Sequence, residues 1–414
     1  MRIAIIAHLK YAISEPFAGG LEMHTHMLAK SLRRRGHEIV LFAATRSDPS
    51  LGVEALCDET SLLETGIAEA NDVAFFREHH AYLKLMTELR KRPFNVIHNN
   101  SLHYLPVSMA ETIATPILTT LHTPPFCWLE SAVRLRHGPS RYCAVSAATA
   151  RMWSHVATID DIVPNGIDLG QFPFRNEADP EPYLVWYGRI VPEKGLDLAI
   201  DAARIAGMPL RIAGPISNPD YYEATIAPRL GPDVTHVGHL SHARLATLVG
   251  GAQAALCTPR WDEPYGLMVA EALACGTPVV AIRLGGIPSI LNERCGILVE
   301  PDDGAALGRA IGRAIHLDRA SCRRRAETSC DAERMVNAYE AIYADMMAAR
   351  LTVPSPSATQ TVREEPALRA PVPRLASATS SDADVGRHTI CLLAALPDRQ
   401  SAVRFFRSCV DAAK

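Results

Sequence analysis

The chain has 414 residues, of which 48% are hydrophobic and 21% are charged, and its formal net charge is −3. This length and composition are typical of a soluble protein with two domains, and the net charge excludes binding to nucleic acid through a strongly basic chain. No run of 18 or more apolar residues occurs and the N-terminal apolar run is too short for a signal peptide, so we expect a cytoplasmic protein without a membrane-spanning helix.

The first half of the chain alternates predicted strands and helices. Residues 2–8 form a continuous apolar run, which is typical of a strand buried on both faces. A loop ending in Gly19 and Gly20 leads to a predicted helix over 21–35, and Gly36 is typical of the residue that ends a helix. This alternation predicts a parallel sheet with helices on both faces. Its further strands are predicted at 38–44, 94–98, 116–122 and 141–145.

The second half shows the same alternation of strands and helices after a connector at 163–182 that is rich in Pro, Gly and Asn. Two doubly wound domains that meet at such a connector leave a cleft between the C-terminal ends of their strands, where open α/β sheets bind ligands. The strands of the second half are predicted at 183–188, 209–213, 233–238, 253–258, 278–282 and 296–299.

Residues 331–349 are predicted to form a closing helix, and the composition changes after it. From residue 351 the chain is rich in Pro, Ala, Ser and Thr, which is typical of a disordered linker. We therefore expect two Rossmann-like domains, a disordered linker and a short tail. The predicted boundaries are 1–165, 166–350, 351–388 and 389–414.

Two glutamates, Glu263 and Glu271, lie eight positions apart. Pro264 is typical of a helix start and Gly276 of a helix end, and a continuous helix between the two carboxylates would span about 12 Å. That distance is too long for an acid–base pair at one glycosidic bond, which needs about 5–9.5 Å. It suits contacts at opposite ends of one elongated ligand. The alternative is that both glutamates are solvated charges on the surface of a helix.

A second candidate site follows the strand predicted at 183–188. Arg189 and Lys194 lie five positions apart, and Gly195 precedes a predicted helix. The free N–H groups and the positive dipole end of a helix, beside two cations, suit a diphosphate. An ordinary surface loop is the alternative. We favour the anion site because the two glutamates occur in the same half of the chain.

Residues that suit ligand contacts also follow strands of the first half. The backbone at Gly20 can approach an anion closely, although a plain strand-to-helix turn would use the same residue. His122 follows a buried strand and can exchange a hydrogen bond with a ligand hydroxyl, with an ordinary loop histidine as the alternative. His98, Asn99 and His103 follow another strand and are candidates for the acceptor side of a site.

No motif for a bound metal or an organic cofactor is found. The ten cysteines contain no CxxC pair, and no cluster of His and Cys has the spacing of a zinc site. The patterns GxGxxG, GxxxxGK[ST], GxSxG and HExxH are also missing. We therefore expect neither a metal nor a cofactor.

These features follow one order along the chain: GG, a histidine after a strand, PNGID at the connector, GRxxxxKG, and the two glutamates with GTPVV after them. This set resembles the retaining glycosyltransferases of family 4, and it covers residues 1–345. The resemblance implies the GT-B fold, in which two Rossmann-like domains face a central cleft. It also implies an acceptor-side domain at 1–165, a donor domain at 166–350, and transfer of a hexose from a UDP- or GDP-sugar to a hydroxyl acceptor.

The resemblance assigns roles to the candidate residues. Arg189 and Lys194 would hold the donor diphosphate and stabilise the departing nucleotide in place of a metal. Gly20 would approach the phosphate from the first domain, and His122 would contact a hydroxyl of the transferred sugar.

The two glutamates would bind the two ends of the donor. Glu271 would bind the ribose hydroxyls and Glu263 would lie beside the transferred sugar. Backbone amides that follow Glu263, at Tyr265, Gly266 and Leu267, would lie near the sugar hydroxyls.

The expected partners are a nucleotide sugar and an acceptor that is a sugar, a lipid-linked sugar or a small molecule. Arg33, Arg34 and Arg35 on the first helix would suit a peripheral contact with the inner face of an anionic membrane, with a solvated helix face as the alternative. Two other functions remain open at this point: an epimerase or phosphorylase of the same fold, and a scaffold or sensor that binds a nucleotide sugar without turnover.

Overall fold

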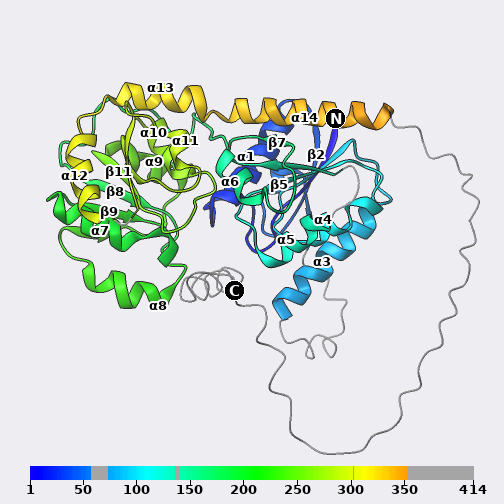
Figure 1. The fold of residues 1–414 in the computed structure, drawn as a ribbon, viewed down its shortest axis with the longest axis horizontal. Coiled ribbons are helices and arrows are strands. Elements are labelled where there is room, and N and C mark those ends of the chain that lie inside the picture. Colours follow the sequence, from blue (N-terminus) through cyan, green and yellow to red (C-terminus); the bar gives the residue numbers. More distant parts are fainter. Residues whose placement is uncertain (57–72, 136–139, 302, 353–414) are drawn as a thin grey trace, which may run out of the picture. The chain divides into compact units, whose positions relative to one another are not determined.

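The computed structural model describes residues 1–56, 73–135, 140–301 and 303–352, and within these residues the chain forms two parallel sheets (Figure 1). The first sheet has seven strands in the order β3-β2-β1-β4-β5-β6-β7. These are β1 Arg2–Ile6, β2 Glu38–Ala43, β3 Val53–Ala55, β4 Val96–Asn99, β5 Ile117–Leu121, β6 Arg141–Ala144 and β7 Asp161–Ile162. The second sheet has six strands in the order β10-β9-β8-β11-β12-β13. These are β8 Leu184–Tyr187, β9 Leu210–Ala213, β10 Val234–His236, β11 Ala254–Cys257, β12 Val279–Ile282 and β13 Gly296–Val299.

Helices connect consecutive strands in both parts. The helices of the first part are α1 Gly20–Arg34, α3 Val73–Leu89, α4 Leu105–Ser108, α5 Cys127–Arg134 and α6 Ala147–Trp153. Those that follow the connector are α7 Leu196–Ile205, α8 Pro219–Tyr221, α9 His242–Gly251, α10 Leu267–Ala274, α11 Ile287–Ile290, α12 Gly304–Ala314, α13 Arg319–Ser329 and α14 Ala332–Thr352.

The predicted fold class of two doubly wound α/β domains is confirmed, and every strand predicted from the sequence is present. The short edge strands β3 and β7 were not predicted, because two or three residues carry no readable alternation. The predicted linker and tail lie outside the described residues from residue 353 onward.

Each sheet is buried on both faces because alternate residues of its central strands enter different cores. In β1, Ile3 and Ile5 pack into a core with α1 and α14, whereas Ala4 and Ile6 pack into a core with α3. In β8 the odd-numbered residues pack with α10 and the even-numbered residues pack with α7 and α12. The continuous apolar runs in the sequence therefore belong to strands covered on both sides.

The strand order places the loops that carry the candidate site residues. In the first sheet the order changes direction between β1 and β4, and in the second between β8 and β11. Ligands of open α/β sheets bind at such points, outside the C-terminal ends of the strands. The segments that follow β8 and β11 contain Arg189, Lys194 and Glu263.

The helix α14 belongs to the core of the first domain, although the sequence grouped residues 331–349 with the second. Its apolar side chains, among them Val336, Tyr339 and Tyr343, share one core with β1, β2 and α1. Figure 1 shows it as the long orange helix that follows α13. The sequence revealed the apolar face of this helix, but not which sheet that face covers.

Candidate active site

Lys194 is fixed by a tight junction between the segments that follow β8 and β11. Gly195, the next residue, has a φ of +61°, and a Cβ atom there would lie 2.0 Å from the carbonyl oxygen of Thr258. The Thr258 hydroxyl in turn donates to the Gly195 carbonyl at 2.8 Å. Only glycine fits both the backbone conformation and this approach. The glycine of the GRxxxxKG pattern therefore joins the two loops that carry the candidate site.

The Lys194 ammonium is ion-paired with Glu263, at 2.6 Å from Nζ to Oε2. Trp261 contributes to the same arrangement, because its indole N–H donates to Glu263 Oε2 at 3.0 Å and its ring lies 5.5 Å from the ammonium. The side chains of Lys194 and Glu263 are 24% and 15% exposed, so the pair is accessible to a ligand while largely protected from bulk water.

Glycines from the turn after β12 support the backbone of Glu263. A Cβ atom on Gly285 would lie 2.1 Å from the carbonyl oxygen of Glu263, and the amide of Gly286 donates to that oxygen at 2.7 Å. From the first domain, the hydroxyls of Ser146 and Thr149 donate to the carbonyl of Pro264 at 2.6 and 3.1 Å. Glu263 is thus held between both domains.

The helix α10 begins at Leu267 and not at Pro264, so the expectation of a helix start at Pro264 is wrong. Gly266 caps the helix with a φ of +103°, a conformation that breaks the helix before it can reach Pro264. At the other end Gly276 has a φ of +85° and its amide and that of Thr277 close the last turn, so the predicted helix end is confirmed. Glu263 therefore lies in a loop and Glu271 lies in a helix, and the backbone amides of Tyr265, Gly266 and Leu267 lie between them.

Glu271 is buried on α10, and burial raises the pKa of its carboxyl from 4.5 to about 7. Tyr187 at the end of β8 is its neighbour and partly opposes this rise. The hydroxyl of Tyr187 also donates to the carbonyl of Met268 at 2.6 Å, which fixes the ring against α10. Keeping an ionisable group in this apolar place costs stability, which is typical of a residue retained for function.

Arg189 faces the first domain. Its guanidinium opposes the burial that raises the pKa of Glu22 on α1, and it adds to the burial that lowers the pKa of Lys10 in the loop after β1. Gly20 lies at the same junction, since a Cβ atom there would be 2.7 Å from Leu267 at the start of α10. Two cations from different domains therefore lie close enough to repel each other, and an anion between them would relieve that repulsion.

The candidate histidine His122 belongs to a buried polar cluster of the first domain that includes Asn100 and His24. Its Nε2 is 2.9 Å from Oδ1 of Asn100, and its ring is packed edge-on against His24 at 4.8 Å. Burial first, and then the neighbouring His24 and His98, lower the pKa of His122 well below 6.5, so the imidazole is neutral at physiological pH. A neutral ring that donates from Nε2 leaves Nδ1 as a hydrogen-bond acceptor.

The candidate residues His98 and Asn99 lie deeper in the first domain. His98 contacts the hydroxyls of Tyr343 and Thr120 at 2.6 and 2.7 Å, so both its ring nitrogens are engaged. Asn99 accepts hydrogen bonds from the amide and hydroxyl of Ser101. Both side chains are fully buried, and these bonds hold the loop after β4 in place. His103, in contrast, lies at the end of this loop, nearer the surface.

Several residues near the site were not singled out from the sequence. Trp261, Ser146 and Thr149 contact the loop of Glu263, and Lys10 and Glu22 face Arg189. Ser146 and Thr149 reach this loop from a segment more than 100 residues away, which no local pattern reveals, whereas Trp261 lies two positions from Glu263 in the same loop. Glu22 had a readable signal, because an acidic residue three positions after a helix cap is typical of a capping box.

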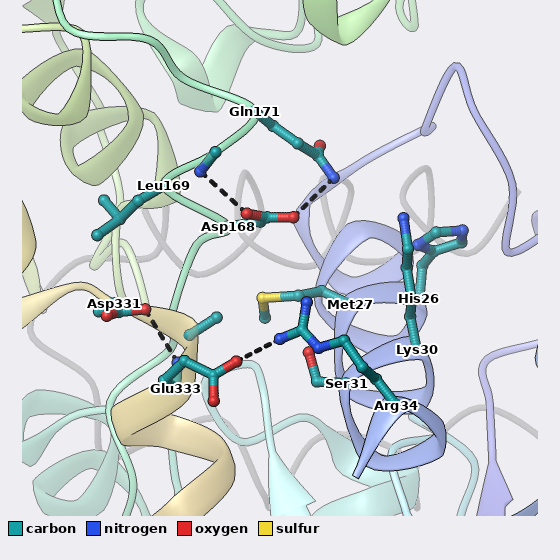
Figure 2. Close-up of a pocket in the computed structure, with 12 residues that line it drawn as sticks. His26, Met27, Lys30, Ser31, Arg34, Asp168, Leu169, Gln171, Asp331 and Glu333 are labelled. Carbon is teal, nitrogen blue, oxygen red and sulfur yellow. Dashed lines mark hydrogen bonds and ion pairs between the residues drawn. The ribbon is translucent and has the colours of Figure 1, made fainter.

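A separate cavity of about 230 Å³ lies between α1, the connector and the start of α14 (Figure 2). Arg34 and Glu333 are ion-paired at its edge. Arg35 pairs with Glu333 and Glu340 of α14. Two of the three arginines considered for a membrane contact thus form ion pairs with carboxylates of α14. No helix of the described residues is long and apolar enough to cross a membrane.

Comparison with known families gives two adjacent matches. Residues 18–171 match the model of Glycosyltransferase Family 4, and residues 171–329 match that of Glycosyl transferases group 1. The two matches meet in the connector and leave α14 outside them.

Among curated proteins, the glycogen synthase of Mycobacterium tuberculosis is 27% identical over 75% of this chain and 86% of its own length. The D-inositol 3-phosphate glycosyltransferase of Pseudarthrobacter chlorophenolicus is 27% identical over 68% of this chain and 79% of its own length.

Solved structures agree with the fold. Sucrose-phosphate synthase from Thermosynechococcus elongatus has a TM-score of 0.69 and 20% identity, and the match covers 84% of this chain and 100% of that one. HepE from Anabaena, solved in complex with UDP-glucose, has a TM-score of 0.65 and 16% identity over 83% of this chain and 100% of its own.

Proposed function

Because the chain belongs to the group 1 glycosyltransferases of GT-B type, we propose that it is a retaining enzyme which transfers a hexose from a nucleotide-diphospho-sugar to a hydroxyl acceptor without a metal ion. The observation that carries the proposal is the ion pair of Lys194 and Glu263 at the switch point of the second sheet, with Arg189 on the same loop as Lys194 and within electrostatic range of Lys10 of the first domain. Chains of this family are glycosyltransferases, and the donor, the stereochemistry and the metal requirement are what we add.

Arg189 and Lys194 would bind the two phosphates of the donor. As the bond between the anomeric carbon and oxygen breaks, negative charge grows on the diphosphate, and cations already in place stabilise it without reorganisation. Lys194 is held by Glu263 before a donor arrives, so its position does not depend on the ligand. Their two positive charges would do the work that a bound metal does in other transferases.

Glu263 and Glu271 would bind the two ends of the donor. Glu263 is ion-paired with Lys194 and would accept hydrogen bonds from hydroxyls of the hexose. Glu271 lies on the other side of the amides that open α10, and its carboxylate would accept hydrogen bonds from the two ribose hydroxyls. Free N–H groups at the first turn of α10 would face the sugar or the phosphate between them.

A UDP-sugar is the donor that we favour. The HepE structures of the same fold are complexes with UDP, with UDP and glucose, and with UDP-glucose. Their identity to this chain is 16–17%. The likeness therefore supports the donor through the shared fold rather than through individual contacts.

The direct experiment measures release of nucleoside diphosphate from a panel of UDP-, GDP- and ADP-sugars, with and without EDTA. We expect turnover with at least one donor, unchanged by EDTA, and NMR should show that the product keeps the anomeric configuration of the donor. Binding of UDP or GDP in a thermal-shift assay without turnover of any donor would instead favour a scaffold or sensor. Loss of turnover in EDTA would refute the metal-independent mechanism.

A further inference from the structure

A second group of side chains lies on the first domain, beyond the residues placed in the donor site. His8 follows β1, His103 and Tyr104 follow β4, Glu78 lies on α3, and Trp128 lies on α5. We call these five residues the α3 cluster. They come from both sides of the first sheet's switch point, where a parallel sheet presents its ligand-binding loops.

The polar end of the α3 cluster is an imidazole beside a carboxylate. His8 Nδ1 lies 3.9 Å from Glu78 Oε1, which is too far for a hydrogen bond, and this nitrogen has no hydrogen-bond partner. Burial and then the nearby Lys10 lower the pKa of His8 to about 4, so the ring is neutral at physiological pH. One hydroxyl group placed beside both atoms could bond to each at about 2.8 Å.

His103 adds a second unsatisfied nitrogen. Its ring is stacked between those of Tyr82 and Tyr104, with centroids 4.5 Å away on either side. Its Nδ1 accepts the amide hydrogen of Leu105 at 3.2 Å, which leaves a proton on Nε2. That buried Nε2 has no partner, although an unsatisfied buried donor costs about 1–3 kcal/mol. Such a cost is typical of a position that a ligand or a water molecule completes.

The apolar end of the α3 cluster is an exposed aromatic ring. Trp128 is 56% exposed and stacks on Tyr104, with centroids 5.7 Å apart and planes 27° from parallel. The Tyr104 hydroxyl is held by His79 at 2.6 Å, so the ring under Trp128 is fixed. Phe75 of α3 also packs against Trp128, with centroids 5.5 Å apart and planes 37° from parallel. More than half of the indole side chain remains exposed beside these two rings, and an exposed indole surface held in this way suits stacking against a second flat or apolar face.

Lys10 connects the α3 cluster electrostatically with Arg189 of the donor site. Lys10 has its pKa lowered by burial and then by Arg189, and Glu78 opposes this shift. One side chain is thus within electrostatic range of both the proposed diphosphate cation and the carboxylate of the cluster. A molecule bound between His8 and Glu78 would therefore lie within electrostatic range of Lys10, the side chain that also senses Arg189.

We propose that the α3 cluster binds an uncharged carbohydrate acceptor, with one sugar hydroxyl between His8 and Glu78 and a more distant ring stacked on Trp128. A sugar ring has an apolar face of C–H groups and a rim of hydroxyls, which matches an indole face beside unsatisfied polar atoms. The Glu78 carboxylate disfavours a phosphorylated acceptor at this place through like-charge repulsion. This inference rests on the proposed function and names the acceptor class of the same site.

The test measures binding of neutral trisaccharides (maltotriose, cellotriose and mannotriose) to the full chain by calorimetry, with and without saturating UDP. The variants are Trp128→Ala, Trp128→Phe and Glu78→Gln, with Ile162→Ala as the control because Ile162 is another exposed apolar residue of this domain, 48% exposed. An anionic probe, myo-inositol 1-phosphate, is titrated in parallel.

We expect at least one trisaccharide to bind, and Trp128→Ala to weaken it at least tenfold. Trp128→Phe should stay within threefold of the wild type, Ile162→Ala should match it, and Glu78→Gln should weaken the sugar without weakening UDP. The inference is overturned if no trisaccharide binds, if Trp128→Ala changes affinity less than twofold, or if the inositol phosphate binds more tightly than every neutral sugar. Failure of the proposed function has a different signature, namely a wild-type chain that neither binds UDP nor turns over any donor.

Discussion

Replacement of Glu271 by glutamine is expected to stabilise the free protein at alkaline pH and, at the same time, to weaken its binding of nucleoside diphosphate. The carboxyl is buried, and its pKa is raised from 4.5 to about 7 by that burial. Glutamine has nearly the same shape and carries no charge at any pH. The variant therefore removes the cost of ionising a buried acid while it removes the charged acceptor proposed for the ribose hydroxyls.

The sign follows from linkage between proton binding and folding. The folded protein binds this proton more tightly than the unfolded chain, so stability is greatest below pH 4.5 and falls as the pH rises through 7. Each tenfold change in the protonation equilibrium is worth about 1.4 kcal/mol, so the raised pKa of Glu271 costs the fold about 3 kcal/mol at pH 8 and about 1 kcal/mol at pH 5.

Thermal unfolding at pH 5 and pH 8, followed for wild type and Glu271→Gln, gives the measurement. At about 2–4 °C per kcal/mol for a domain of this size, the variant should gain about 4–8 °C more at pH 8 than at pH 5. Affinity for UDP, titrated at pH 8, should fall by tenfold or more because hydrogen bonds to a charged acceptor are worth about 1.5–3 kcal/mol each.

Two results would refute this reasoning. An equal change in melting temperature at both pH values would show that Glu271 does not titrate between them. Unchanged UDP affinity at pH 8 would show that the carboxylate does not contact the nucleotide, even if the stability effect is present.

Two further variants probe the loop after β8. Lys194→Ala should lower turnover at least 100-fold, as removal of a group that stabilises the transition state does. Lys30→Ala on α1 is the control. A loss of less than threefold in the Lys194 variant would contradict the role of Lys194. Gly195→Ala should lower the melting temperature and turnover together, because its Cβ atom would lie 2.0 Å from the Thr258 carbonyl at a φ of +61°; a variant with wild-type stability would show that this junction can relax.

Local patterns were sufficient for the elements of this fold. Apolar runs identified each central strand because a strand buried on both faces has apolar side chains at successive positions. Gly36 and Gly276 were readable as helix ends because the left-handed conformation there requires glycine, and both have positive φ. The same reasoning placed a helix start at Pro264, and it failed because Gly266 and the turn at Gly285 hold that segment as a loop.

By itself the sequence determined the two doubly wound sheets, the order of the candidate residues along the chain and the family to which they point. Those properties depend on neighbours within one strand, one helix or one turn. The tertiary structure alone decided which groups come together: Lys194 with Glu263 and Trp261, α14 with the first sheet, and His8 with Glu78, with Arg189 and Lys10 in electrostatic range of each other. Such meetings depend on how distant segments pack, and residues far apart in a chain leave no local pattern that records their contact.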